Sequence, residues 1–298
     1  FFVSKRVASE IVTRAHAYEE LGYAISHAPV DMSGFPAHFN ADLGPVRVTT
    51  PKGLKAELMN AQLSGKAYFP LSWSVLHSGV SLFEHSKPSG TSISVTVDTG
   101  IAKIDAQALA AGGGLKRLNI EARSLEMALT TGDPLPVKSL ETLEYSFARA
   151  GQTAQLSATA RGAALNAGPL GQLGRALGHE ISLITGEGTI ENFGAPTPRY
   201  LSDTLNVLWG PVDIGGGFDV TRGESGVLNG TINLTVANDT ELLDELADKG
   251  ILSNGEKMFA SMIIGNLPQT DDGRRKVSIS VKDSQMSIGS MTLGRLPF

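Results

Sequence analysis

The sequence predicts a mainly β protein. We expect an elongated antiparallel meander that forms a curled sheet or a sandwich, with an N-terminal helix and a C-terminal helical hairpin. Three observations predict this class. Apolar and polar residues alternate along many short segments, as in antiparallel strands with one buried face. Helical spacing is confined to a few segments. Glycine (34) and proline (14) are frequent, which indicates many turns.

The first element is a predicted helix over residues 3–21. Its apolar residues recur at spacings of three and four (Val3, Val7, Ile11, Ala15, Tyr18 and Leu21), and Gly22 ends it. The chain opens on Phe1, Phe2 and Val3 without a starting Met. This is consistent with the removal of a signal peptide or membrane anchor, or with an arbitrary fragment boundary.

Strands follow from residue 46 to 161, where the period changes to two. The clearest are 71–75, 92–98, 118–123, 143–147 and 154–161. Each has an apolar side and a polar side, whereas strands of parallel α/β sheets are apolar on both sides. The pattern therefore argues against a Rossmann or TIM-barrel enzyme scaffold.

The second half combines strands with helices. Thr197 and Pro198 predict the start of a short helix that carries Tyr200, Leu201, Leu205, Leu208 and Trp209. After a strand at 228–236, Asp239 is expected to cap a helix that ends at Gly250. Ser253 and Glu256 have capping-box spacing and open another helix, with Met258, Phe259, Met262 and Ile263 on one face. Strands at 277–281 and 286–288 close the chain.

We expect three regions: the helix at 1–22, a first β-meander at 23–162, and a second β region with helices at 163–298. The Gly- and Ala-rich segment 163–178 is the best linker candidate. The two β regions could also form one continuous domain.

Composition excludes several functions. The net charge is −5, which argues against nucleic-acid binding. The chain contains no Cys, so cysteine nucleophiles, disulfides and iron–sulfur clusters are absent. The six His residues show no metal-binding spacing, and we expect them at the surface or at the edge of the core. The runs 112–114 and 215–217 lack the Lys that follows phosphate-binding glycines, so we interpret them as turns or bulges. We expect no cofactor, no metal and no enzymatic activity.

The apolar side of the predicted sheet gives the functional hypothesis. The few short helices cannot cover it, so the sheet either packs on itself or curls into an open groove. Because the side is lined by aliphatic residues, an open groove suits acyl chains. We therefore expect a hydrophobic ligand, such as a lipid, to bind there; the alternative is a closed, dry scaffold that docks envelope protein partners. The expected lining residues are Trp73, Ile93, Val95, Val97, Leu118, Ile120, Ile232, Leu234, Val277 and Ile279.

The loop at Gly34, Phe35 and Pro36 has two interpretations. It could face a partner or a membrane. The preferred interpretation is a tight turn in which Phe35 plugs the end of the sheet.

Two stretches resemble a known family. Gly22–Tyr23 with the Ser-Gly-Phe-Pro run at 33–36, and the closing run 273–297, resemble the proteobacterial family called domain of unknown function 2125. The resemblance implies a periplasmic body, an inner-membrane anchor or signal in a missing N-terminal segment, and no catalytic residues to carry over. A more distant likeness to AsmA-type envelope proteins, which look like lipid-handling β grooves, favours the groove.

Overall fold

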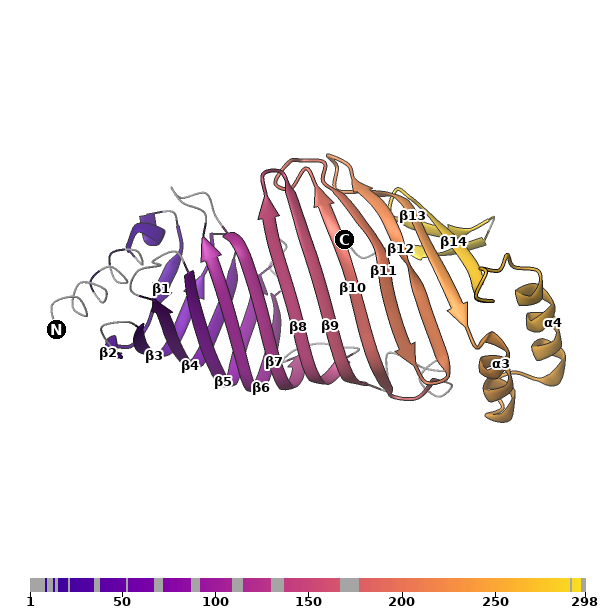
Figure 1. Cartoon of the computed structure of the whole chain (residues 1–298), viewed down its shortest axis with the longest axis horizontal. Helices are drawn as coiled ribbons and strands as arrows, with labels where there is room; N and C mark the ends of the chain where they lie inside the picture. The colour runs from indigo at the N-terminus through magenta and orange to yellow at the C-terminus, as the bar shows by residue number, and fades with distance from the viewer. Residues whose placement is uncertain are drawn as a thin grey trace. The chain divides into compact units, whose positions relative to one another are not determined.

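The chain divides into two compact units, residues 1–144 and 145–298. The computed structural model describes residues 9, 13, 16–20, 22–34, 38–51, 53–66, 72–86, 92–108, 115–129, 137–166, 177–289 and 291–295. The described residues are mainly strands in an antiparallel meander that does not close on itself (Figure 1). The predicted fold class is confirmed in these respects.

The first unit consists of strands that pair with their neighbours in the chain. The order is β1-β3-β4-β5-β6-β7, and β2 also pairs with β3. The described residues of the predicted N-terminal helix (9, 13 and 16–20) are helical. The strands are β1 (Ala24–Ser26), β2 (Asp31–Ser33), β3 (His38–Thr49), β4 (Leu54–Lys66), β5 (Ser72–Ser86), β6 (Ser92–Ala108), β7 (Leu115–Leu129) and β8 (Val137–Ala150), the last of which leads into the second unit.

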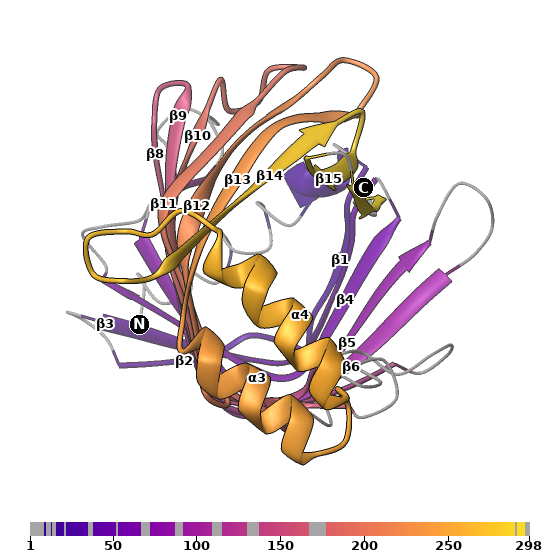
Figure 2. The same cartoon turned by 90° about the vertical axis from the view of Figure 1, so that its right-hand side faces the viewer.

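The second unit continues the same pattern from β9 to β16, and its long strands curve along their length (Figure 2). The elements are β9 (Thr153–Leu165), β10 (Glu180–Glu191), β11 (Arg199–Trp209), β12 (Val212–Arg222), β13 (Leu228–Ala237), α3 (Asp239–Asp248), α4 (Asn254–Gly265), β14 (Arg275–Lys282), β15 (Gln285–Ile288) and β16 (Met291–Arg295). The expected region boundary at 162/163 falls inside β9, and most of the linker candidate (167–176) lies outside the described residues.

The predicted helix after Thr197 and Pro198 is wrong, because Arg199–Trp209 forms strand β11. Its register with β12 shifts between Ser202 and Leu205. Such a bulge adds one residue to one strand and breaks the alternation. The alternation is therefore interrupted, and the spacings of four and three between Leu201, Leu205 and Leu208 imitate a helix.

The glycines at 215–217 do not form a turn but lie inside β12. The alternative, a bulge, fits better, because the register shift of β11 lies opposite Gly216 to Phe218. A Cβ on Gly216 would lie 2.1 Å from Asn233 O, and one on Gly217 would lie 1.9 Å from Ser202 O. The neighbouring backbones therefore exclude any side chain there. The other run, 112–114, lies outside the described residues.

The predicted helical hairpin is confirmed. Ser253 and Glu256 form the reciprocal capping box of α4. Asp239 is not a cap: it is the first residue of α3, and the preceding Asn238 makes no side-chain cap bond. Instead the Asp239 carboxylate lies 3.4 Å from Arg275 Nε.

α3 attaches the hairpin to the sheet. Its Leu243 is 5% exposed, and Leu242 and Leu246 pack in the cluster that contains Trp209 and Val212 at one end of β11 and β12. No described helix is both long and apolar enough to cross a membrane.

Candidate apolar ligand site

Strand register gathers apolar residues on one face of the first unit. Trp73 on β5 lies opposite Ala106, which lies opposite Leu118 on β7. The next row joins Val75, Ile104 and Ile120 in the same way, because side chains directly opposite each other share a face. We call these residues and those in register with them the apolar face of the first unit: Phe39, Ala41, Leu63, Trp73, Val75, Val95, Val97, Ala102, Ile104, Leu118, Ile120, Ala122, Leu125 and Met127.

Most large side chains of this face are only partly buried. The buried apolar residues here are mainly small, and they include Ala41, Ala61, Ala102 and Ala122. Among the described residues of the whole chain, no large side chain is less than 2% exposed. A closed core normally buries its large aliphatic side chains fully. The described face is thus covered less than a dry core would be.

The expected lining residues of the first unit fall on this face together. Trp73, Val95, Val97, Leu118 and Ile120 are all half-buried there. The backbone of Ile93 on β6 is paired with the backbone of His85 on β5.

A buried polar group lies within the apolar face. His77 and Ser81 are 4% and 2% exposed. The Nδ1 of His77 lies 2.8 Å from Asn60 O, and its Nε2 lies 2.6 Å from Ser81 Oγ. Because a carbonyl oxygen can only accept, Nδ1 donates to Asn60 O. The hydrogen bonds of this group join β5 to β4. They lie beside register shifts in the β4–β5 and β5–β6 pairs, where a bulge bends a strand, so they stabilise that bend. The expectation of a surface or core-edge position is wrong for His77.

Alternation did not single out the aromatic contact at one end of this face. The ring of Phe39, 4% exposed, meets the ring of Trp73 edge-on with centroids 5.0 Å apart. Gly65 lies between them in register, and a Cβ there would lie 2.4 Å from Phe39 Cζ. Gly65 thus provides the space for Phe39. Of the loop predicted to plug the sheet, Gly34 is described, with a φ of 85°, whereas Phe35 and Pro36 lie outside the described residues.

The second unit carries the other four expected residues. Ile232 is paired with Ile279, and Leu234 with Val277. Val220, Leu228 and Val281 form a buried cluster against which Phe218, Ile232 and Met286 pack. Here too the sequence pattern identified residues that share one face of the sheet.

A cavity of about 720 Å³ lies beside these residues. Leu234 and Val277 border it, together with Phe218, Ile288, and Leu267 and Pro268 from the segment after α4. Gly216, which also borders the cavity, lies opposite Leu234 in the sheet. The sequence pattern missed Phe218, Leu267 and Ile288, since only the fold brings them together.

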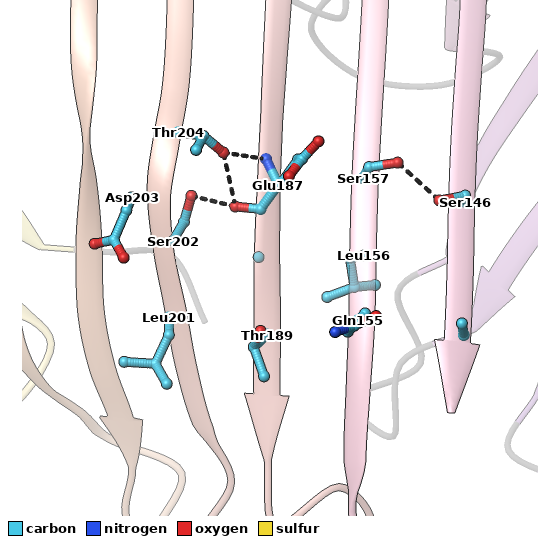
Figure 3. A pocket seen from close by; sticks show the side chains of 12 residues that line it. Ser146, Gln155, Leu156, Ser157, Glu187, Thr189, Leu201, Ser202, Asp203 and Thr204 are labelled. Carbon is cyan, nitrogen blue, oxygen red and sulfur yellow. Dashed lines mark hydrogen bonds between the residues drawn. The ribbon is translucent and has the colours of Figure 1, made fainter. Parts of the chain in front are cut away.

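A second hollow, of about 430 Å³, lies over β8 to β11 and is polar (Figure 3). Ser202 Oγ donates to Glu187 O at 2.5 Å, and Glu187 N donates to Thr204 Oγ1 at 2.8 Å. The carboxylates of Glu187 and Asp203 point away from one another (Figure 3), and no His among the described residues borders this hollow.

Two carboxylates of the sheet are paired with cations: Asp105 with Lys103, and Asp219, which borders the cavity of the second unit, with Arg199. Burial raises the pKa of Asp105, but hydrogen bonds from Lys103 and Ser74 outweigh it and hold that pKa below its ordinary value. In the second unit, Arg199 donates to both carboxylate oxygens of Asp219, at 2.8 and 2.6 Å, and lowers the pKa of Asp219. These pairs keep both carboxylates ionised near neutral pH.

No group of three or more metal-binding side chains occurs among the described residues. No curated protein and no solved structure matches the chain significantly. A family model does match residues 1–297, and its description is uncharacterized protein conserved in bacteria (DUF2125). The chain therefore belongs to the DUF2125 family.

Proposed function

We propose that this protein binds a hydrophobic ligand with a long acyl chain, such as a lipid, on the apolar face of its curved sheet, and that it is a binding protein of the bacterial envelope rather than an enzyme. One observation carries the proposal: five neighbouring strands, β3 to β7, align their apolar residues in register and leave most of the large ones partly exposed. A large exposed apolar surface is costly unless something covers it.

The composition of the face favours an acyl chain. It is lined mainly by Val, Ile, Leu and Ala, with Trp73, Phe39 and Met127 as the other large side chains. The polar groups within it, His77 and Ser81, bond to each other and to Asn60, so they are not free to recognise a sugar. Aliphatic surfaces of this kind bind chains by shape and by exclusion of water.

A periplasmic location and an N-terminal membrane anchor belong to the same proposal. They are supported by the family resemblance of the segments at 22–36 and 273–297. The alternative, an envelope scaffold that docks protein partners through its outer surface, requires the apolar faces to be closed and dry. The partial exposure of Val95, Val97 and Ile120 favours binding.

Titration with cis-parinaric acid, a fluorescent long-chain fatty acid, tests the proposal. Ile120→Ser removes an aliphatic side chain from the apolar face. Ile101→Ser makes the same change at a 52% exposed side chain that borders the opposite, charged side with Lys103 and Glu121. Losing half the burial of an isoleucine corresponds to about 1 kcal/mol, so Ile120→Ser should weaken binding about fivefold.

Ile101→Ser should bind as the wild type does, and matching circular dichroism melts would show that both variants are folded. Extraction of the purified protein with organic solvent, followed by mass spectrometry, should also release a co-purified lipid. Absence of both lipid and probe binding would refute the proposed function. Equal weakening by the two variants would place the site elsewhere.

A further inference from the structure

Helix α4 presents an apolar stripe that nothing in the described structure covers. Met258, Phe259, Met262 and Ile263 are 74%, 61%, 59% and 49% exposed. α4 has no buried residue at all, whereas the adjacent α3 buries Leu243. Four large apolar side chains exposed together on one helix indicate an interaction surface.

The polar contacts of α4 turn this stripe outward. Lys257 Nζ lies 2.6 Å from the Asp244 carboxylate of α3. With a rotation of about 100° per residue, the centre of the stripe lies about 170° around the helix from Lys257. The ion pair therefore faces α3 while the stripe faces away from it. The capping box at Ser253 fixes the first turn of α4. At the other end of the helix, the Arg275 guanidinium donates to Gly265 O at 3.3 Å.

We propose that the exposed stripe of α4 docks the protein on the surface of an uncharged, zwitterionic lipid bilayer. The inference rests on the proposed function, because the bilayer is the source or destination of the apolar ligand. Continuity with the apolar cavity supports it: α4 ends at Gly265, and Leu267 and Pro268, which follow directly, border the cavity of the second unit. Docking through α4 places a bilayer beside that cavity.

The charges around the stripe select the kind of surface. Lys249 and Lys257 form ion pairs with Glu245 and Asp244 within the hairpin. Glu241 and Asp248 are exposed, and no ion pair involves them within the described residues. An acidic surrounding repels anionic lipids, so binding must come from insertion of the apolar side chains.

The side chains of the stripe also favour a bilayer over a protein partner. Protein interfaces draw most of their binding energy from Trp, Tyr and Arg, and α4 contains none of these. A second copy of the chain would bring the acidic hairpin against itself. The stripe carries no hydrogen-bonding side chain, which suits insertion at the boundary between lipid headgroups and acyl chains.

Flotation with vesicles tests the inference on the full chain. The wild type should float with phosphatidylcholine vesicles, and less well when half of the lipid is phosphatidylglycerol. The double variant Phe259→Ser, Met262→Ser should reduce the floated fraction at least tenfold. Met59→Ser, at a 46% exposed methionine of β4, is the matched control and should float normally. Circular dichroism should show that both variants fold, since all three side chains are exposed.

The inference is wrong if the wild type does not float, if the double variant floats equally well, or if anionic vesicles bind better. Sedimentation equilibrium tests the alternative that the stripe binds a second copy of the chain. A dimeric wild type together with a monomeric double variant would support that alternative and contradict bilayer docking. Titration with cis-parinaric acid without vesicles separates this inference from the proposed function. The double variant should still bind the probe. If the wild type does not bind the probe, the proposed function itself is refuted.

Discussion

The contact between Phe39 and Gly65 should be energetically coupled. Truncation of Phe39, which is 4% exposed and meets the Trp73 ring at 5.0 Å, should cost about 3 kcal/mol, as for a large aromatic side chain in a core. Gly65→Ala places its Cβ 2.4 Å from Phe39 Cζ and should cost about 2 kcal/mol by overpacking. In the Phe39→Ala background the ring is gone. Gly65→Ala should then be neutral, or stabilising by about 0.5 kcal/mol, because alanine is better ordered than glycine in a strand.

Urea unfolding of the four proteins of this cycle measures the coupling. The chain has two tryptophans, so Trp209→Phe in all four leaves Trp73 fluorescence to report on the first unit. The expected coupling is about 2 kcal/mol, within the range for residues in contact. Additive effects of the two substitutions would refute the assignment of Gly65 as the residue that makes room for the Phe39 ring.

Three further predictions concern the second unit. Asp219→Asn should lower the stability at neutral pH, because Arg199 stabilises only the ionised carboxylate. The difference from the wild type should disappear as the pH falls through the depressed pKa of Asp219 in the folded protein. Unfolding measurements of both proteins across the acid range check this, and a difference that does not change with pH contradicts it. Ser253→Ala should cost about 1 kcal/mol through loss of the α4 cap, and hydrogen exchange should accelerate mainly in α4; unchanged exchange contradicts the cap. Gly230→Ala should prevent folding, since its Cβ would lie 2.0 Å from Asp219 O. A Cβ at Gly255 would meet open space, so Gly255→Ala should stabilise α4 by about 0.5 kcal/mol. Thermal melts compare the two variants, and a normally folded Gly230→Ala variant contradicts the close approach.

The sequence predicted the apolar face well because alternation determines which side chains share a side of a strand. Val95, Val97 and Ile120 were identified from a period of two. Val97 packs in the cluster of Ala102, Ala122 and Leu125, and Ile120 lies two residues before Ala122 on β7. What the pattern could not predict is the contribution of residues without a side chain. Gly65 makes room for the Phe39 ring, and Gly216 allows the close approach of the β13 backbone. Such contacts between segments leave no local periodic signal.

The misinterpretation of β11 has a similar origin. The bulge between Ser202 and Leu205 shifts the phase of alternation, and Pro198 completes an imitation of a helix start. In contrast, the capping box at Ser253 and Glu256 is a local interaction within one turn, so the sequence predicted it correctly.

The central claim is that an acyl chain lies along the apolar face of the first unit. Photo-crosslinking with a diazirine-bearing palmitate, followed by peptide mass spectrometry, tests it most directly. We expect adducts on the apolar side of β5 to β7, at residues such as Val75, Val97 and Ile120, and excess unlabelled palmitate should suppress them. Adducts confined to the charged side, at Ile101, Lys103 or Glu121, would contradict it.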